Sequence, residues 1–145
     1  MVPGLQPWWA SPVMMRSANF FLIISDDQDV LDLYVELVRA QRRPVIGVGT
    51  CEDALTAARI VPCRAALFDV NADDDWAALA RLRERLSRRV PLVVLSGWLD
   101  ADRTFRNRAR ELGCAGFVAK PATGTLVVRA LQHAAEGSPW SEYVD

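Results

Sequence analysis

Side chains that could handle a phosphoryl group or a cation occur at four places in this 145-residue chain, each directly after an apolar run: Ser25-Asp26-Asp27, Asp69, Ser96 and Lys120. Carboxylates held close together repel one another unless a hard cation that prefers oxygen ligands, such as Mg²⁺, neutralises them. A carboxylate beside such a cation can attack a phosphoryl group and form an aspartyl phosphate. Asp69 is therefore the candidate nucleophile.

A lysine and a serine could complete this chemistry. The ammonium of Lys120 could pair with one phosphoryl oxygen, and the hydroxyl of Ser96 could donate a hydrogen bond to another. Lys120 is the only lysine among 17 basic residues. Either basic residue serves on a solvated surface, whereas the planar arginine fork does not replace a lysine in a tight pocket. The composition therefore supports a specific role for Lys120.

The elements that must position these side chains alternate between apolar runs and helical periodicity. The expected strands are 20–24, 45–48, 65–68, 90–95 and 116–119, and the expected helices are about 30–38, 52–60, 75–86, 102–112 and 126–135. This alternation predicts right-handed βαβ crossovers and a doubly wound α/β fold, with a five-stranded parallel sheet and about five helices. Ligands bind such sheets at the carboxyl ends of the strands, where the four polar segments lie.

The two ends of the chain differ from its middle. Residues 1–17 contain three prolines and no periodicity, so we expect an irregular arm, followed by one domain over 18–136 and a C-terminal tail over 137–145. The aromatic residues of the arm and the tail are expected to pack on the domain or on a second copy, in a homodimer; they are Trp8, Trp9, Trp140 and Tyr143.

Charge and composition narrow the class of function. The net charge is −1, from 17 basic and 18 acidic residues, so no overall field favours nucleic acid or an anionic membrane. No long apolar run predicts a membrane span, and the three cysteines lack metal-ligand spacing, so a reduced cytoplasmic protein is expected. The arginines at 81–89 and 103–110 are expected on solvated helix faces.

Four segments, IISDDQDVL, ALFDVN, LVVLSG and AGFVAKP, resemble in this order the receiver domains of two-component response regulators, over about residues 19–135. The resemblance implies a flavodoxin-like receiver fold in which Asp69 accepts a phosphoryl group from a histidine kinase or a histidine phosphotransfer protein. It also implies Mg²⁺ held by Asp26, Asp69 and the backbone carbonyl of Asn71. Such a domain is no conventional enzyme and catalyses at most its own phosphorylation and dephosphorylation.

The resemblance further implies a switch formed by Ser96, Phe117 and Lys120. Phosphorylation would change a face of the domain that contacts a downstream effector protein or an output domain outside this chain. The Lys120–Pro121 peptide bond is expected to be cis, as is typical at this place in the family.

The residues after the first strand depart from the family pattern, which usually has two acids there. Helical periodicity puts Ser25 in the first acidic position and Asp26 in the second, which is the direct metal ligand. A serine in the first position should weaken Mg²⁺ binding, and Asp27 could compensate. A shift of one residue, which makes Asp26 and Asp27 the pair, stays open. The alternative function is a pseudo-receiver that is not phosphorylated and acts as an interaction or dimerisation module.

Two further features have alternative interpretations. The acids at 73–75 either begin a helix, which we favour, or assist Mg²⁺ entry. Trp98 either shields a phosphorylated Asp69 from water or lies in a partner interface. A haloacid-dehalogenase-like phosphatase also uses an aspartyl nucleophile, but it needs a second acid two residues later, where this chain has Asn71.

Overall fold

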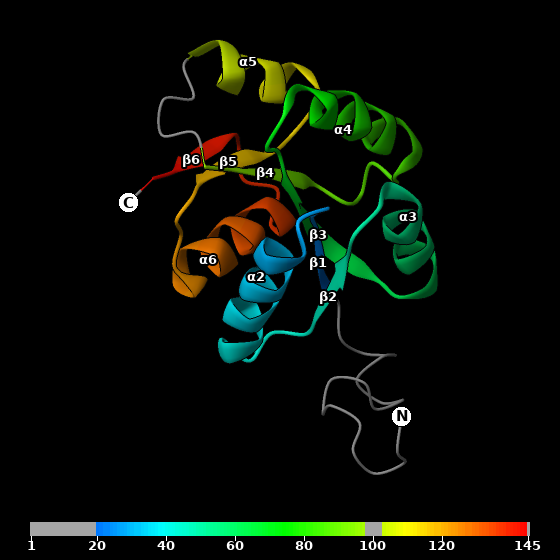
Figure 1. The fold of residues 1–145 in the computed structure, drawn as a ribbon, viewed down its shortest axis with the longest axis vertical. Helices are drawn as coiled ribbons and strands as arrows, with labels where there is room; N and C mark the ends of the chain where they lie inside the picture. The colour runs from blue at the N-terminus through cyan, green and yellow to red at the C-terminus, as the bar shows by residue number, and fades with distance from the viewer. Residues whose placement is uncertain (1–19, 98–102, 145) are drawn as a thin grey trace.

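Six strands and five helices alternate in the part of the chain that the computed structural model describes, residues 20–97 and 103–144 (Figure 1). The strands are β1 (Phe20–Ile24), β2 (Val45–Val48), β3 (Cys63–Asp69), β4 (Leu92–Ser96), β5 (Gly116–Ala119) and β6 (Ser141–Tyr143). The helices are α2 (Gln28–Ala40), α3 (Cys51–Ile60), α4 (Asp73–Arg85), α5 (Arg103–Glu111) and α6 (Gly124–Ala135).

All six strands lie parallel in one sheet, in the order β2-β1-β3-β4-β5-β6. The direction of winding reverses between β1 and β3, which is the place where such sheets bind ligands. The predicted doubly wound α/β fold is confirmed. The predicted number of strands was wrong, because residues 141–143 of the expected tail pair with β5 as a sixth strand. A three-residue polar strand carries no periodicity that could reveal it.

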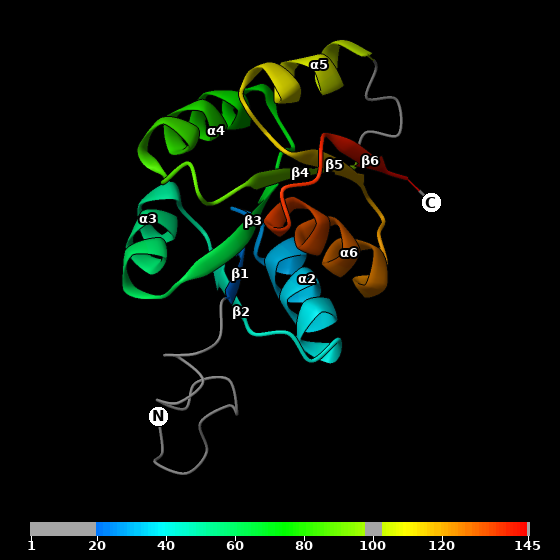
Figure 2. The ribbon, with the colours of Figure 1, turned by 180° about the vertical axis from the view of Figure 1, so that it is seen from behind.

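Helices cover both faces of the sheet, α2 and α6 on one face and α3, α4 and α5 on the other (Figures 1 and 2). Successive side chains of a strand point to opposite faces. In β1, Phe21 and Ile23 accordingly join the core cluster beneath α2 and α6, and Leu22 and Ile24 join the cluster beneath the other three helices. Because both faces are covered, the central strands are continuous apolar runs.

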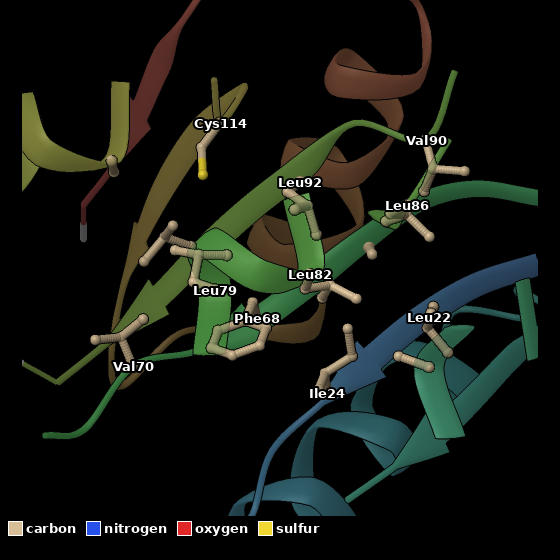
Figure 3. Packing of buried hydrophobic residues seen from close by; sticks show 14 of the residues in the cluster. Leu22, Ile24, Phe68, Val70, Leu79, Leu82, Leu86, Val90, Leu92 and Cys114 are labelled. Atoms are coloured by element: carbon tan, nitrogen blue, oxygen red, sulfur yellow. The ribbon is translucent and has the colours of Figure 1, made fainter. Parts of the chain in front are cut away.

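Figure 3 shows part of the cluster on the second face, where leucines of α4 meet side chains of β1 and β3. Leu79 and Leu82 are fully buried there. Helix α5 contributes less, since Ala109 is its only buried residue. Strands β1 and β3 are thus tightly packed against α4, and α5 is the helix that contributes least to the core.

Side-chain hydrogen bonds to backbone N–H groups stabilise the N-terminal ends of several helices. The carboxylate of Asp27 accepts hydrogen bonds from the backbone N–H groups of Asp29 and Val30 and caps α2. The carboxylate of Asp75 accepts hydrogen bonds from the backbone N–H groups of Asn71 and Ala72, at 2.7 and 3.0 Å. The expectation that the acids at 73–75 begin a helix is therefore confirmed.

Arg83 does not lie on a solvated face, contrary to the expectation for the arginines at 81–89. It is buried, and its guanidinium donates hydrogen bonds to the backbone carbonyls of Val90, Ser87 and Leu86. The arginine thereby donates to three carbonyls in the connection between α4 and β4, where buried carbonyls need such donors.

Candidate functional site

Asp69 is the last residue of β3 and lies at the carboxyl edge of the sheet, beside the point where the winding reverses. Only 3% of the residue is exposed. Its Oδ1 atom accepts a hydrogen bond from Lys120 Nζ at 2.8 Å, in an ion pair whose side chains are 1% and 15% exposed. A buried carboxylate needs such a partner, because an unpaired charge away from water is costly.

The second oxygen of Asp69 accepts two hydrogen bonds. Ser25 Oγ donates to Asp69 Oδ2 at 2.8 Å, and Asn71 Nδ2 donates to the same atom at 2.7 Å. Ser25 directly follows β1 and is 3% exposed. Ser25 is therefore the residue after β1 whose side chain contacts the candidate nucleophile. This contact favours the alignment that puts serine in the first acidic position.

Lys120 directly follows β5, and two contacts besides the ion pair fix it. Its backbone N–H donates to the carbonyl of Ser96 at 2.7 Å, and its Nζ donates to Asn71 Oδ1 at 2.8 Å. The peptide bond to Pro121 is cis, as expected. Ser96 ends β4 between these strands and is 0% exposed. The structure thus brings Ser25, Asp69, Asn71 and Lys120 into one hydrogen-bonded group, with Ser96 at the adjoining strand end.

Asp26 and Asp27 are placed differently from each other. Asp26 is exposed and lines the same cavity of about 320 Å³ as Asp69. Asp27 caps α2 with its carboxylate. Among the described residues, no three histidine, cysteine, aspartate or glutamate side chains form a metal-binding group. Asp26 and Asp69 thus both border this cavity, whereas the carboxylate of Asp27 is engaged at the start of α2.

The cavity continues from Asp69 between α3 and α4, past Cys51, Leu55 and Arg81. Burial raises the pKa of the Cys51 thiol above its usual value of 9.0. A protonated thiol is a poor nucleophile, so Cys51 is less suited than a carboxylate to covalent chemistry at neutral pH.

Phe117 lies in β5 and is 2% exposed. Its ring packs edge-on against Phe105 of α5, with 5.6 Å between ring centroids, and Phe105 packs in the same way against Trp76 of α4, at 4.7 Å. Phe117 was predicted from the sequence, but this row of three rings was not, because contacts between elements far apart in the chain leave no local sequence pattern. Trp98, for which two roles were weighed, lies outside the described residues.

Comparison with solved structures finds many receiver domains of response regulators. A CheY-like receiver domain protein from Methanospirillum hungatei JF-1 superposes with a TM-score of 0.69 at 18% identity, over 83% of this chain and 96% of that one. The receiver domain of a sensor histidine kinase from Pseudomonas aeruginosa PAO1, with magnesium coordinated in its active-site cleft, has a TM-score of 0.66 at 21% identity, over 83% and 99%. The fold is that of a receiver domain.

A third receiver-fold structure is a response regulator from Burkholderia pseudomallei with a phosphorylated aspartic acid, a calcium ion and citrate. Its TM-score is 0.66 at 21% identity, over 82% of this chain and 69% of that one. No family model and no curated protein matches this chain. At such low identities the likeness concerns the receiver fold alone. Within the described residues, no helix has the length and apolar character needed to cross a membrane.

Proposed function

We propose that this chain is a receiver module that accepts a phosphoryl group on Asp69 and transmits its state to a partner protein. The observation that carries the proposal is the buried ion pair between Asp69 and Lys120, at 2.8 Å, at the edge where the strands β1, β3, β4 and β5 end. Asp69 also lines the cavity that Asp26 borders, which gives a donor access to the carboxylate.

The proposed step is attack by a carboxylate oxygen of Asp69 on the phosphorus of a phosphohistidine. A phosphorus–oxygen bond forms, the phosphorus–nitrogen bond of the donor breaks, and its electron pair stays on the imidazole nitrogen. Lys120 keeps its proton and pairs with the negative charge that the phosphoryl group brings. The Ser25 hydroxyl and the Asn71 side-chain amide are neutral donors that already contact Asp69, and the Ser96 hydroxyl lies at the adjoining strand end.

The residues fit Mg²⁺ through Asp26, Asp69 and the carbonyl of Asn71, and the bound cation would neutralise charge on the phosphoryl oxygens. Asp27 is the least suited of the predicted ligands, because Asp29 and Val30 already donate to its carboxylate. We accordingly expect weaker Mg²⁺ binding than a site with three carboxylates would show.

The phosphoryl donor that suits this site is a histidine kinase or a histidine phosphotransfer protein, acting in the cytoplasm. The receiving partner is an effector protein or an output domain that reads the state of Ser96, Phe117 and Lys120. The row of rings from Phe117 through Phe105 to Trp76 supports this role, since it connects β5 to the two helices α5 and α4.

Incubation with acetyl phosphate and Mg²⁺, followed by intact-protein mass spectrometry, tests the proposal. We expect one phosphoryl group per chain and none in the Asp69→Asn variant. Omitting Mg²⁺ should reduce the incorporation. Lys120→Arg should also lower it, because the guanidinium fork does not reproduce the two contacts of the ammonium to Asp69 and Asn71.

A pseudo-receiver is the second candidate, and one observation favours it. The carboxylate of Asp69 already has three protein donors, from Ser25, Asn71 and Lys120, which satisfy its charge without a cation. An unmodified mass at saturating donor and Mg²⁺, in protein whose folding is verified by circular dichroism, would assign the chain to this class.

A further inference from the structure

The C-terminal segment, defined here as residues 139–144, lies on a surface formed by β5, α5 and α6. Its strand β6 pairs in parallel with the first three residues of β5, with Ser141 opposite Gly116, Glu142 opposite Phe117 and Tyr143 opposite Val118. The segment therefore covers the edge of β5, which is the strand that leads directly to Lys120 (Figure 1).

Side chains from two helices hold the segment. Arg106 of α5 forms an ion pair with Glu142 at 3.5 Å, and the guanidinium of Arg110 lies 5.6 Å from the centre of the Trp140 ring. On the other side of the segment, His133 of α6 and Tyr143 of β6 form a hydrogen bond, with 2.7 Å between Nδ1 and Oη. Contacts of this kind are individually weak when they are partly exposed to water.

Gly116 shows that β5 is adapted to this neighbour. A Cβ atom at Gly116 would lie 2.9 Å from the backbone carbonyl oxygen of Ser141, closer than real Cβ contacts. Backbone cannot turn aside as a flexible side chain can, so any larger residue at 116 would push β6 away. The absence of a side chain at 116 thus permits the close approach of the segment.

The same strand and helix also connect the segment to the site. Lys120 follows β5 directly and pairs with Asp69. Phe117 contacts Phe105 of α5, and the residue after Phe105 is Arg106, which holds Glu142. Helix α5 has only Ala109 buried, and its contacts with the neighbouring α4 are those of Phe105 and Arg108 with the Trp76 ring. Phosphorylation of Asp69 replaces the carboxylate charge that Lys120 Nζ contacts at Oδ1, so we expect the ammonium to move toward the phosphoryl oxygens.

We propose that the C-terminal segment is a displaceable ligand of the surface formed by β5, α5 and α6, held in cis, and that phosphorylation of Asp69 loosens it. This inference rests on the proposed function. The surface that the segment leaves fits an extended strand with an acidic side chain for Arg106 and an aromatic ring for Arg110. By linkage, loosening the segment must favour the modified state of Asp69 by the same factor.

Hydrogen–deuterium exchange of the full chain tests the inference. Phosphorylated protein should exchange the amides of residues 140–144 about fivefold faster than unmodified protein, the low end of usual coupling strengths, while amides of β1 stay unchanged. Gly116→Ala should produce the same acceleration without phosphorylation. It should also raise the affinity for beryllofluoride with Mg²⁺ about fivefold, because of the reciprocity of coupled equilibria.

Matched variants separate the docking from general effects of charge. Glu142→Gln should accelerate exchange of the segment, whereas Glu136→Gln, which removes the same charge from an exposed position at the end of α6, should not. A phosphorylated mass with unchanged exchange at 140–144 overturns the inference and leaves the proposed function intact. An unmodified mass overturns the proposed function. In that case Lys120→Ala decides the link between site and segment, since unchanged exchange at 140–144 in this variant overturns it.

Discussion

Ser25 gives this site its particular balance of charge. It places a neutral hydroxyl 2.8 Å from Asp69 Oδ2, in the position where an acid would add a second negative charge. One carboxylate against one ammonium leaves the pair of Asp69 and Lys120 close to neutral without a cation. Hydrogen-bond donors of the protein therefore provide most of the stabilisation of the buried Asp69 charge. Less stabilisation by a bound Mg²⁺ is needed as a result.

Replacing Ser25 with aspartate tests this account. Ser25→Asp should raise the affinity for Mg²⁺ about tenfold, because cation affinity follows the number of charged ligands. In the absence of Mg²⁺ the variant should unfold at lower denaturant concentration, since two carboxylates then repel each other in a buried site. Isothermal titration with Mg²⁺ and urea unfolding measure the two effects.

Ser25→Asn provides the control, because it matches aspartate in size without the charge. It should leave Mg²⁺ affinity at or below that of the natural protein. If the aspartate and asparagine variants bound Mg²⁺ equally well, charge at position 25 would not determine the affinity.

Single residues also show where prediction from sequence stops. Asp69 and Lys120 were found because each ends an apolar run, and the fold brings strand ends together. The side-chain amide of Asn71, which bridges Asp69 and Lys120, was not foreseen, because the sequence reveals which residues lie close but not how a side chain turns. Arg83 was misjudged because helical periodicity cannot distinguish a solvated arginine from one that donates to buried carbonyls.

At the scale of elements, the five βα units could be predicted because both faces of the sheet are covered, so the central strands are continuous apolar runs and the helices have clear apolar stripes. Strand β6 could not, since its stability comes from the neighbouring edge of β5 and from side chains of α5 and α6. The packing between helices could not be predicted from the sequence either, and the contact of α2 with α6 is an example.

Gly124, at the start of α6, allows these two helices to approach closely. A Cβ atom there would lie 2.7 Å from the backbone carbonyl oxygen of Leu37 in α2. Gly124→Ala should therefore destabilise the protein by about 1–3 kcal/mol, the usual cost of overpacking, although alanine favours helices. Urea unfolding monitored by far-UV circular dichroism measures the change. An increase in stability would mean that α2 and α6 separate without cost.

At the scale of the whole molecule, buried thiols make the stability depend on pH. Burial raises the pKa of Cys63 and Cys114 from 9.0 to about 12. Above pH 9 the thiols of the unfolded chain lose their protons while those of the folded chain keep them. The unfolded state then binds fewer protons, so the free energy of unfolding falls as the pH rises from 9 toward 12.

Urea unfolding at about pH 8 and about pH 10.5 measures this decline. The Cys63→Ala/Cys114→Ala double variant is the control, because it lacks both thiols and should lose less stability over the same interval. Equal losses in the two proteins would show that the thiols do not cause the decline.

The short strand β6 also has a consequence for solubility. Without it, β5 would be the edge of the sheet, and its Gly-Phe-Val-Ala backbone would offer unpaired N–H and C=O groups flanked by apolar side chains, a template on which other chains aggregate. β6 replaces that edge with one that is three residues long and carries the exposed carboxylate of Glu142. Short, charged edges are how natural sheets prevent uncontrolled strand pairing, so this segment protects the molecule from self-association in addition to any part it has in signalling.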